Sequence, residues 1–236
     1  MTPEQAAHET ASAIVSTSSR FMTDPATYGD AAKLGFEGMD FYIAGRGGVL
    51  GEVPAAVATA ALVFFEPAAV SAAWVRSGSL MSRAEAAATW ADAMHHWARA
   101  HFADDVDWAR VAELAGEIVR AAPVAGAPLF AGWRVLPEPG DAKALAMHRM
   151  NALRELRGAL HEAAILTVGL TPLEAIAVRS PRMASVFGWT EALPDTAPLL
   201  DRWQLAESRT DRMIGRHYRA LTESAREEFV TLLSNS

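Results

Sequence analysis

The chain has 236 residues, of which 51% are hydrophobic and 21% charged, and its net charge is −7. This composition excludes a disordered chain, and the absence of cysteine excludes disulfides and thiolate metal sites. The acidic balance gives no electrostatic attraction to nucleic acid, and no apolar run reaches membrane length. We therefore expect a cytoplasmic protein with no membrane partner.

Helix start signals recur along the chain. Capping boxes begin at Thr2, Ser82 and Thr171, with a proline in the first turn after Thr2 and Thr171. Almost nothing alternates with a period of two, which argues against a sheet. We predict an all-α fold, a single multi-helix bundle of about ten helices, over residues 2–19, 29–44, 54–64, 67–77, 82–102, 107–122, 140–169, 171–187, 195–220 and 222–233.

One long irregular segment, 123–139, separates these predicted helices. Its Pro, Gly and aromatic residues predict a loop packed across the bundle instead of a flexible linker. The chain is then either one helical domain, 1–236, or two helical halves, 1–122 and 140–236, joined by this loop. A homodimer is compatible with either arrangement.

A glycine-rich stretch occupies residues 39–53 but lacks the spacing of a nucleotide-binding loop. Its glycines instead favour close backbone packing or a turn with positive φ. Three polar residues, Asp40, Tyr42 and Arg46, stand among apolar neighbours and must be paired if buried. Either Asp40 pairs with an arginine, such as Arg154 or Arg157, or all three polar residues face a pocket.

The histidines of the segment 91–105 do not have the spacing of a zinc helix, and no Gly-x-Ser-x-Gly elbow is present. We therefore predict no metal and no cofactor.

The predicted helix over 140–169 carries an unusual amount of positive charge. At about 100° per residue, Arg154, Arg157 and His161 share one edge, beside an apolar stripe that faces the core. A helical wheel drawn at this angle directs the polar side of the helix toward solvent and predicts that His148 lies at the surface. The solvent-facing residues are Asn151, Glu155 and Glu162.

Two interpretations of this basic edge remain open. The arginines either pair with carboxylates of a neighbouring helix, or hold an anionic ligand beside the titratable His161. The second interpretation requires that the edge faces a cavity and not water.

Four segments occur in an order that resembles a family of all-helical actinobacterial proteins catalogued as helix-turn-helix proteins and often encoded near antibiotic-biosynthesis genes. They read FYIAGRGGVLGEV (41–53), APLFAGWRVLPEP (127–139), LRELRGALHEAAILTVGLTPLEA (153–175), and FGWTE with ESRTD (187–191 and 207–211). The resemblance implies DNA binding. Longer relatives place a winged-helix portion after the G-W-T element, whereas residues 192–206 here have no hairpin signal, and we expect no nucleic-acid partner.

These observations predict an enzyme or accessory enzyme of specialised metabolism that performs acid–base chemistry, such as elimination, cyclisation or isomerisation, on a small anionic substrate. We expect Arg46, Arg154 and Arg157 to bind the anion. The expected catalytic residues are His161, Asp40 and Tyr42. The alternatives are a metabolite-binding regulator or sensor with a degenerate helix-turn-helix, and a haem protein that uses His161 as an axial ligand.

Overall fold

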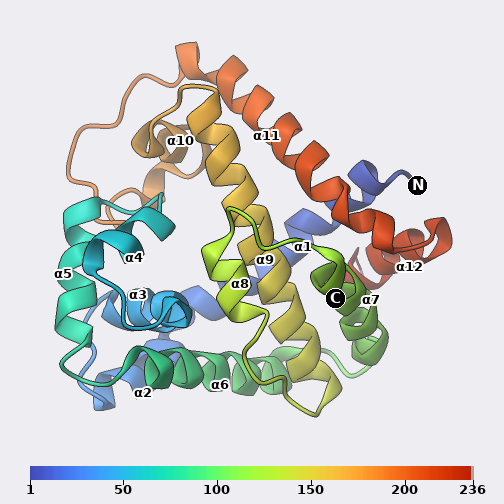
Figure 1. Cartoon of the computed structure of the whole chain (residues 1–236), viewed down its shortest axis with the longest axis horizontal. Helices are drawn as coiled ribbons and strands as arrows, with labels where there is room; N and C mark the ends of the chain where they lie inside the picture. Colours follow the sequence, from blue (N-terminus) through green and yellow to red (C-terminus); the bar gives the residue numbers. More distant parts are fainter. Residues whose placement is uncertain (235–236) are drawn as a thin grey trace.

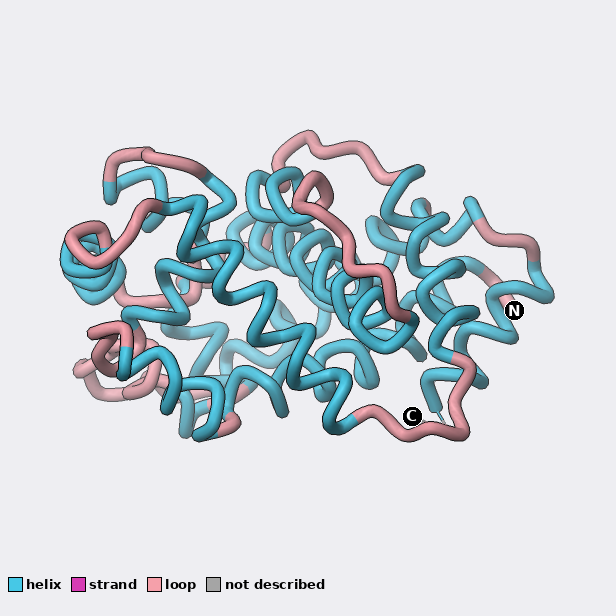
Figure 2. Tube along the Cα trace, turned by 90° about the horizontal axis from the view of Figure 1, so that it is seen from below, coloured by secondary structure: helices cyan, strands magenta, loops and turns pink. Residues whose placement is uncertain are grey.

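The computed structural model describes residues 1–234, and this part of the chain consists of helices and connecting loops without a strand (Figures 1 and 2). The predicted all-α class is confirmed. The α-helices are α1 (Pro3–Thr23), α2 (Pro25–Lys33), α3 (Asp40–Gly47), α4 (Ala55–Ala61), α5 (Pro67–Ser77), α6 (Arg83–His101), α7 (Trp108–Ala121), α8 (Pro128–Trp133), α9 (Ala142–Thr167), α10 (Pro172–Arg179), α11 (Leu200–Gly215) and α12 (Glu223–Ser234). Short 3-10 helices cover Gly48–Leu50 (η1), Pro181–Met183 (η2), Ala197–Leu199 (η3) and His217–Ala220 (η4).

The predicted helix starts are formed as the capping boxes require. At Thr2, Ser82 and Thr171 the side chain accepts a hydrogen bond from the third helical residue, whose own side chain accepts from the cap backbone. These caps fix where α1, α6 and α10 begin.

The structure differs from the sequence prediction at several helix ends. The single helix predicted over 29–44 is instead two helices, α2 and α3, separated by residues 34–39, and α8 lies inside the segment 123–139 that was expected to be irregular. The helix predicted over 171–187 ends at Arg179, because Ser180 precedes Pro181 and leaves the helical conformation, with a φ of −152° and a ψ of 63°. A residue before proline is disfavoured in helical geometry, so α10 has only 8 residues.

The 26-residue helix α9 is the central element of the fold (Figure 1). It packs against α1, α6, α7 and α11, which come from both sides of the 123–139 segment, and against α8, which lies within that segment. One hydrophobic cluster extends from Ala6 to Leu233, and a smaller cluster joins the end of α9 to α10 and α11. The two halves of the sequence therefore share a core.

Close backbone packing explains two of the clustered glycines. Trp90 on α6 is fully buried, and its ring lies edge-on to those of Phe21, Phe41 and Tyr42. A Cβ atom on Gly45 would come within 2.6 Å of the Trp90 Cβ, and one on Gly48 would meet the backbone of α6. The glycines bring α3 against α6 and so place Tyr42 and Arg46 beside α9.

The prediction that His148 lies at the surface is wrong. Its side chain, on α9, is buried against α6, and its Nδ1 atom lies 3.1 Å from Nε2 of His95. His148 also forms a hydrogen bond with the backbone of Trp133 in α8. The helical wheel predicted its exposure incorrectly, because α6 and α8 cover the side of α9 that was expected to face solvent.

No single helix within residues 1–234 is long and apolar enough to cross a membrane. By length and composition alone, α9 and α10 meet that test only as a pair, and the pair is bent by 111°.

Candidate functional site

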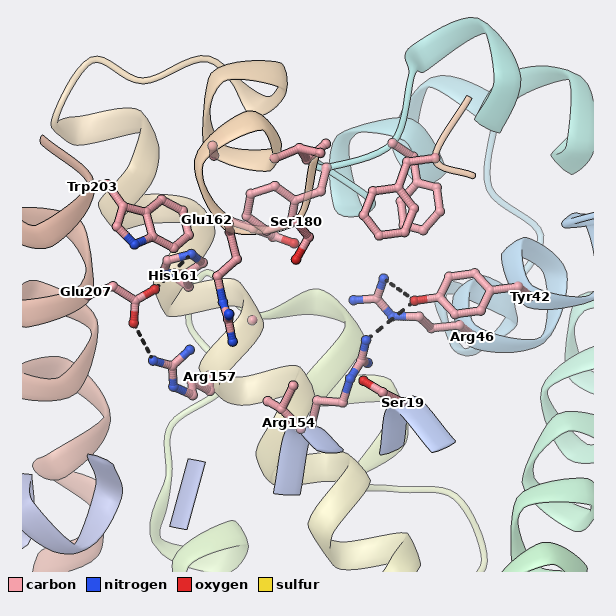
Figure 3. Close-up of a pocket in the computed structure, with 18 residues that line it drawn as sticks. Ser19, Tyr42, Arg46, Arg154, Arg157, His161, Glu162, Ser180, Trp203 and Glu207 are labelled. Carbon is pink, nitrogen blue, oxygen red and sulfur yellow. Dashed lines mark hydrogen bonds and ion pairs between the residues drawn. The ribbon is translucent and has the colours of Figure 1, made fainter. Parts of the chain in front are cut away.

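A cavity of about 380 Å³ lies where α1, α3, α9, α10 and α11 meet (Figure 3). Its wall combines polar residues, most of them on α9, with aromatic side chains. The charged or titratable lining residues are Tyr42, Arg46, Arg154, Arg157, His161, Glu162, Arg179 and Glu207, and the other aromatic ones are Phe64, Phe65, Phe187 and Trp203. The size is within the range of small-molecule sites.

α9 faces the cavity with the residues at positions 154, 157, 158, 161 and 162, spaced by three and four. This spacing places them on one side of a helix. Arg154, Arg157 and His161 share this side, as the wheel predicted. The expectation that Glu155 and Glu162 point to solvent is wrong, because Glu155 is 1% exposed and Glu162 lines the cavity. Asn151, which was placed on the same solvent side, is also buried.

A buried ion-pair cluster forms one side of the cavity. Arg46 donates from Nε and Nη2 to the two carboxylate oxygens of Glu155, at 2.8 and 2.9 Å. Arg154 donates to Oε1 of the same carboxylate at 2.8 Å. The Tyr42 hydroxyl lies 3.3 Å from Nη1 of Arg46. Burial favours the neutral form of Glu155, but the two guanidinium groups outweigh it and hold its pKa below the usual value.

A second cluster occupies the opposite side (Figure 3). Arg157 donates to Glu207 at 2.9 Å and to Asp211 at 3.4 Å, both on α11. His161 Nε2 lies 3.6 Å from Oε1 of Glu207, and its Nδ1 lies 3.0 Å from the Thr210 hydroxyl. The interpretation of the basic edge as helix–helix ion pairs therefore holds for Arg157, although the same side chain also lines the cavity.

The environment of His161 determines its protonation. The Thr210 hydroxyl already donates to the Ala206 carbonyl, so it accepts from Nδ1–H of His161 and leaves the Nε2 lone pair toward Glu207. Burial, against the opposing effect of Glu207 and with a smaller contribution from Arg157, lowers the pKa of His161 to about 4. A pKa this low does not favour the expected exchange of a proton by His161 near neutral pH. The Glu207 carboxylate lies on the side of His161 Nε2 to which a haem iron would have to bind.

Two charged groups in the cavity are left without a direct partner. Neither the Glu162 carboxyl nor the Arg179 guanidinium forms a hydrogen bond or an ion pair with any other residue of the described chain. Burial raises the pKa of Glu162 to about 7, and Glu155 raises it too, while Arg46 and Arg154 act in the opposite direction. The sequence prediction missed both groups as site residues. For Glu162, its position one residue after His161 was the available signal.

Asp40 does not belong to this cavity. It accepts two hydrogen bonds from Arg76 on α5, at 2.9 and 2.6 Å, in a neighbouring cleft of about 400 Å³. Asp40 therefore pairs with an arginine of another helix, as one interpretation expected, but the partner is Arg76 and not Arg154 or Arg157, and Asp40 does not face the same pocket as His161. The fold separates them because Asp40 begins α3 on the α5 side, whereas Arg46 ends it on the α9 side.

The segment between α10 and α11 closes one side of the cavity. The Phe187 carbonyl accepts from the Glu66 backbone at 2.8 Å, and the Trp189 indole donates to the Phe64 carbonyl at 2.9 Å. The Phe187 ring packs on that of Phe65, with centroids 4.5 Å apart. The F-G-W motif thus holds aromatic wall residues against the cavity.

No group of three or more His, Asp or Glu residues in the portion 1–234 is placed to bind a metal ion. The cavity instead offers guanidinium groups, one carboxyl of raised pKa and aromatic faces. These groups suit an anion with an apolar body.

Known proteins give one further indication. No curated protein and no solved structure matches the chain. A family model described as "Helix-turn-helix family" matches residues 7–202, which include every residue that lines the cavity except Trp203 and Glu207 on α11. The chain belongs to this helix-turn-helix family.

Proposed function

We propose that this protein binds a small organic anion in the cavity and acts as a ligand sensor of the helix-turn-helix family. The observation that carries the proposal is Arg179, a solvent-exposed cationic group at the cavity wall with no ion-pair partner among the described residues. Arg154 shares its only carboxylate, Glu155, with Arg46. A carboxylate, sulfate or phosphate would satisfy both guanidinium groups.

The helix pair α9–α10 supports the sensor assignment. The helices meet at 111° across a four-residue turn, Val168–Thr171, in which Gly169 has a φ of +76°. This is the geometry of a helix-turn-helix unit. Because α10 contributes Ala175, Ile176 and Arg179 to the cavity, a bound ligand would restrain its position relative to α9.

We infer that this helix pair does not read DNA. The first turn of α10 presents Pro172, Leu173 and Glu174, which provide neither the basic nor the amide groups that contact base edges. The arginine of its last turn, Arg179, lines the cavity instead. A gel-shift assay with random-sequence duplexes at physiological salt tests this inference, and salt-resistant binding would contradict it.

Calorimetry with a panel of small carboxylates, sulfates and phosphates, each paired with a neutral isostere, tests the function itself. We expect anions to bind and neutral isosteres to bind weakly or not at all. Arg179→Met should weaken binding by roughly 10- to 100-fold, the usual effect of losing a hydrogen bond to a charged group. Arg182→Met is the matched control, because Arg182 is exposed on the same segment and does not line the cavity. Equal effects of the two substitutions would contradict the proposal.

A second candidate function, acid–base catalysis on the bound anion, follows from Glu162. A carboxyl whose pKa is about 7 is suited to transfer a proton at neutral pH, whereas His161 is not. We place Glu162 in the role first expected of His161, with Tyr42 and the arginines around the substrate. Recovery of every bound ligand unchanged after prolonged incubation would favour the sensor over the enzyme.

The resemblance to actinobacterial proteins encoded near antibiotic-biosynthesis genes favours an intermediate or product of specialised metabolism as the natural ligand. Such a ligand would combine an acidic group with a ring system, which matches the arginines and the aromatic walls of the cavity.

A further inference from the structure

We propose that the cavity takes up an aromatic monocarboxylate together with one proton, which Glu162 carries in the complex. The inference rests on the proposed anion-binding function and adds to it a ligand class and a role for Glu162.

The first support is the placement of Glu162. Its carboxyl lines the cavity and forms no hydrogen bond or ion pair within residues 1–234. Charged or titratable groups surround it from α3, α9, α10 and α11, while α1 contributes only Val15 and Ser19. These surrounding groups are Tyr42, Arg46, Arg154, Glu155, Arg157, His161, Arg179 and Glu207.

The second support is the pairing of charge. Glu155 is ion-paired with Arg46 and Arg154, and Glu207 with Arg157. Glu162 is the lining carboxyl that no guanidinium pairs with in the described chain. Protonation of Glu162 removes a negative charge from the wall and so favours a bound carboxylate.

The third support is the shape of the apolar wall. Phe64 and Trp203 lie against the His161 ring, with centroids 5.8 and 5.3 Å from it. Phe65 and Phe187 continue the aromatic surface. Rings pack favourably edge-on or offset on such faces, so a planar aromatic body fits between them.

The direction of proton movement follows from electrostatics. Burial already raises the pKa of Glu162 to about 7, and a carboxylate bound nearby disfavours a second negative charge and raises it further. Binding therefore takes a proton from solvent wherever the free carboxyl is ionised, which is above pH 7. His161 does not compete for this proton at neutral pH, because its pKa is about 4.

Isothermal titration calorimetry with benzoate tests the proposal. Benzoate is fully ionised from pH 6 to 8, so any proton uptake belongs to the protein. In two amine buffers of different ionisation enthalpy at pH 8, we expect close to one proton taken up per benzoate. Affinity should be about tenfold higher at pH 6 than at pH 8, the change that one group with a free pKa near 7 produces by linkage.

Glu162→Gln fixes the side chain in a neutral form of the same shape. We expect this variant to bind benzoate without proton uptake, and at pH 8 with the affinity that the unmodified protein has at pH 6. Glu113→Gln is the control, because Glu113 forms an exposed ion pair with Arg110 and does not line the cavity, and it should keep both the affinity and the proton uptake. A purely structural role of Glu162 would weaken binding at every pH.

The outcomes separate the two proposals. Benzoate binding without proton uptake, or with the same pH dependence in Glu162→Gln, overturns the role of Glu162 and leaves anion binding intact. If neither benzoate nor the larger 1-naphthoate binds at any pH tested, the aromatic carboxylate class is overturned. If, in addition, no member of the anion panel binds, the proposed function fails as well.

Discussion

Glu155 is the residue whose loss should most destabilise the protein. Its carboxylate is 1% exposed and accepts from Arg46 and Arg154 at 2.8 to 2.9 Å. Glu155→Gln keeps the shape but removes the charge that neutralises the buried Arg46. Breaking a buried ion pair by removing one partner costs about 3–5 kcal/mol.

Urea unfolding followed by tryptophan fluorescence measures this loss. For a chain of this length, 3–5 kcal/mol corresponds to a decrease in Tm of roughly 6–20 °C. Arg46→Met should cost less than Glu155→Gln, because Arg154 still partners the remaining carboxylate. Glu113→Gln is the control, since Glu113 forms an exposed pair with Arg110, and such pairs contribute about 0–1 kcal/mol.

Two results would refute this reasoning. One is a loss below about 1 kcal/mol for Glu155→Gln, which would place the Glu155 carboxylate in contact with water. The other is a larger loss for Arg46→Met than for Glu155→Gln, which would mean that Arg154 does not share the carboxylate.

The remaining predictions concern other parts of the fold. Burial lowers the pKa of His95 to about 4 and that of His148 below its usual value, so the unfolded chain binds more protons than the folded one. The free energy of unfolding should have its full value above pH 6.5 and decrease by on the order of 2 kcal/mol as the pH falls toward 4. The urea concentration at the unfolding midpoint, measured across this pH range, checks this prediction. Gly188→Ala should cost about 1–3 kcal/mol, because Gly188 has a φ of +90° and an added Cβ would lie 2.6 Å from that of Ala69; a Tm that does not change would contradict the described packing. Trp189→Phe removes the indole donor and should cost about 1 kcal/mol and speed proteolysis within 180–199, which mass spectrometry of a limited digest detects.

The fold class followed from local signals that act within a few residues. Thr2, Ser82 and Thr171 cap their helices as their spacing predicted, since a capping box satisfies its own backbone groups whatever packs around it. Short helices such as α2 and α8 lack such boxes and depend on packing, so the pattern did not reveal them.

The candidate site could be predicted only in part. The helical wheel placed Arg154, Arg157 and His161 on one side of α9, because the angle between residues is a property of the helix itself. The wheel does not say which sectors other helices cover. Glu162 and His148 were therefore misassigned to solvent.

What the sequence alone determined about this protein is its helical class, its capped helix starts and the relative directions of side chains along α9. Only the tertiary structure decided which arginine pairs with Asp40, that Glu155 is enclosed between two guanidinium groups, and that Glu162 faces a cavity. The physical reason is that caps and helix angles arise from bonds between near neighbours in the chain. Ion-pair choice, burial and the pKa of a buried carboxyl depend on groups that are distant in sequence and meet only when the helices pack.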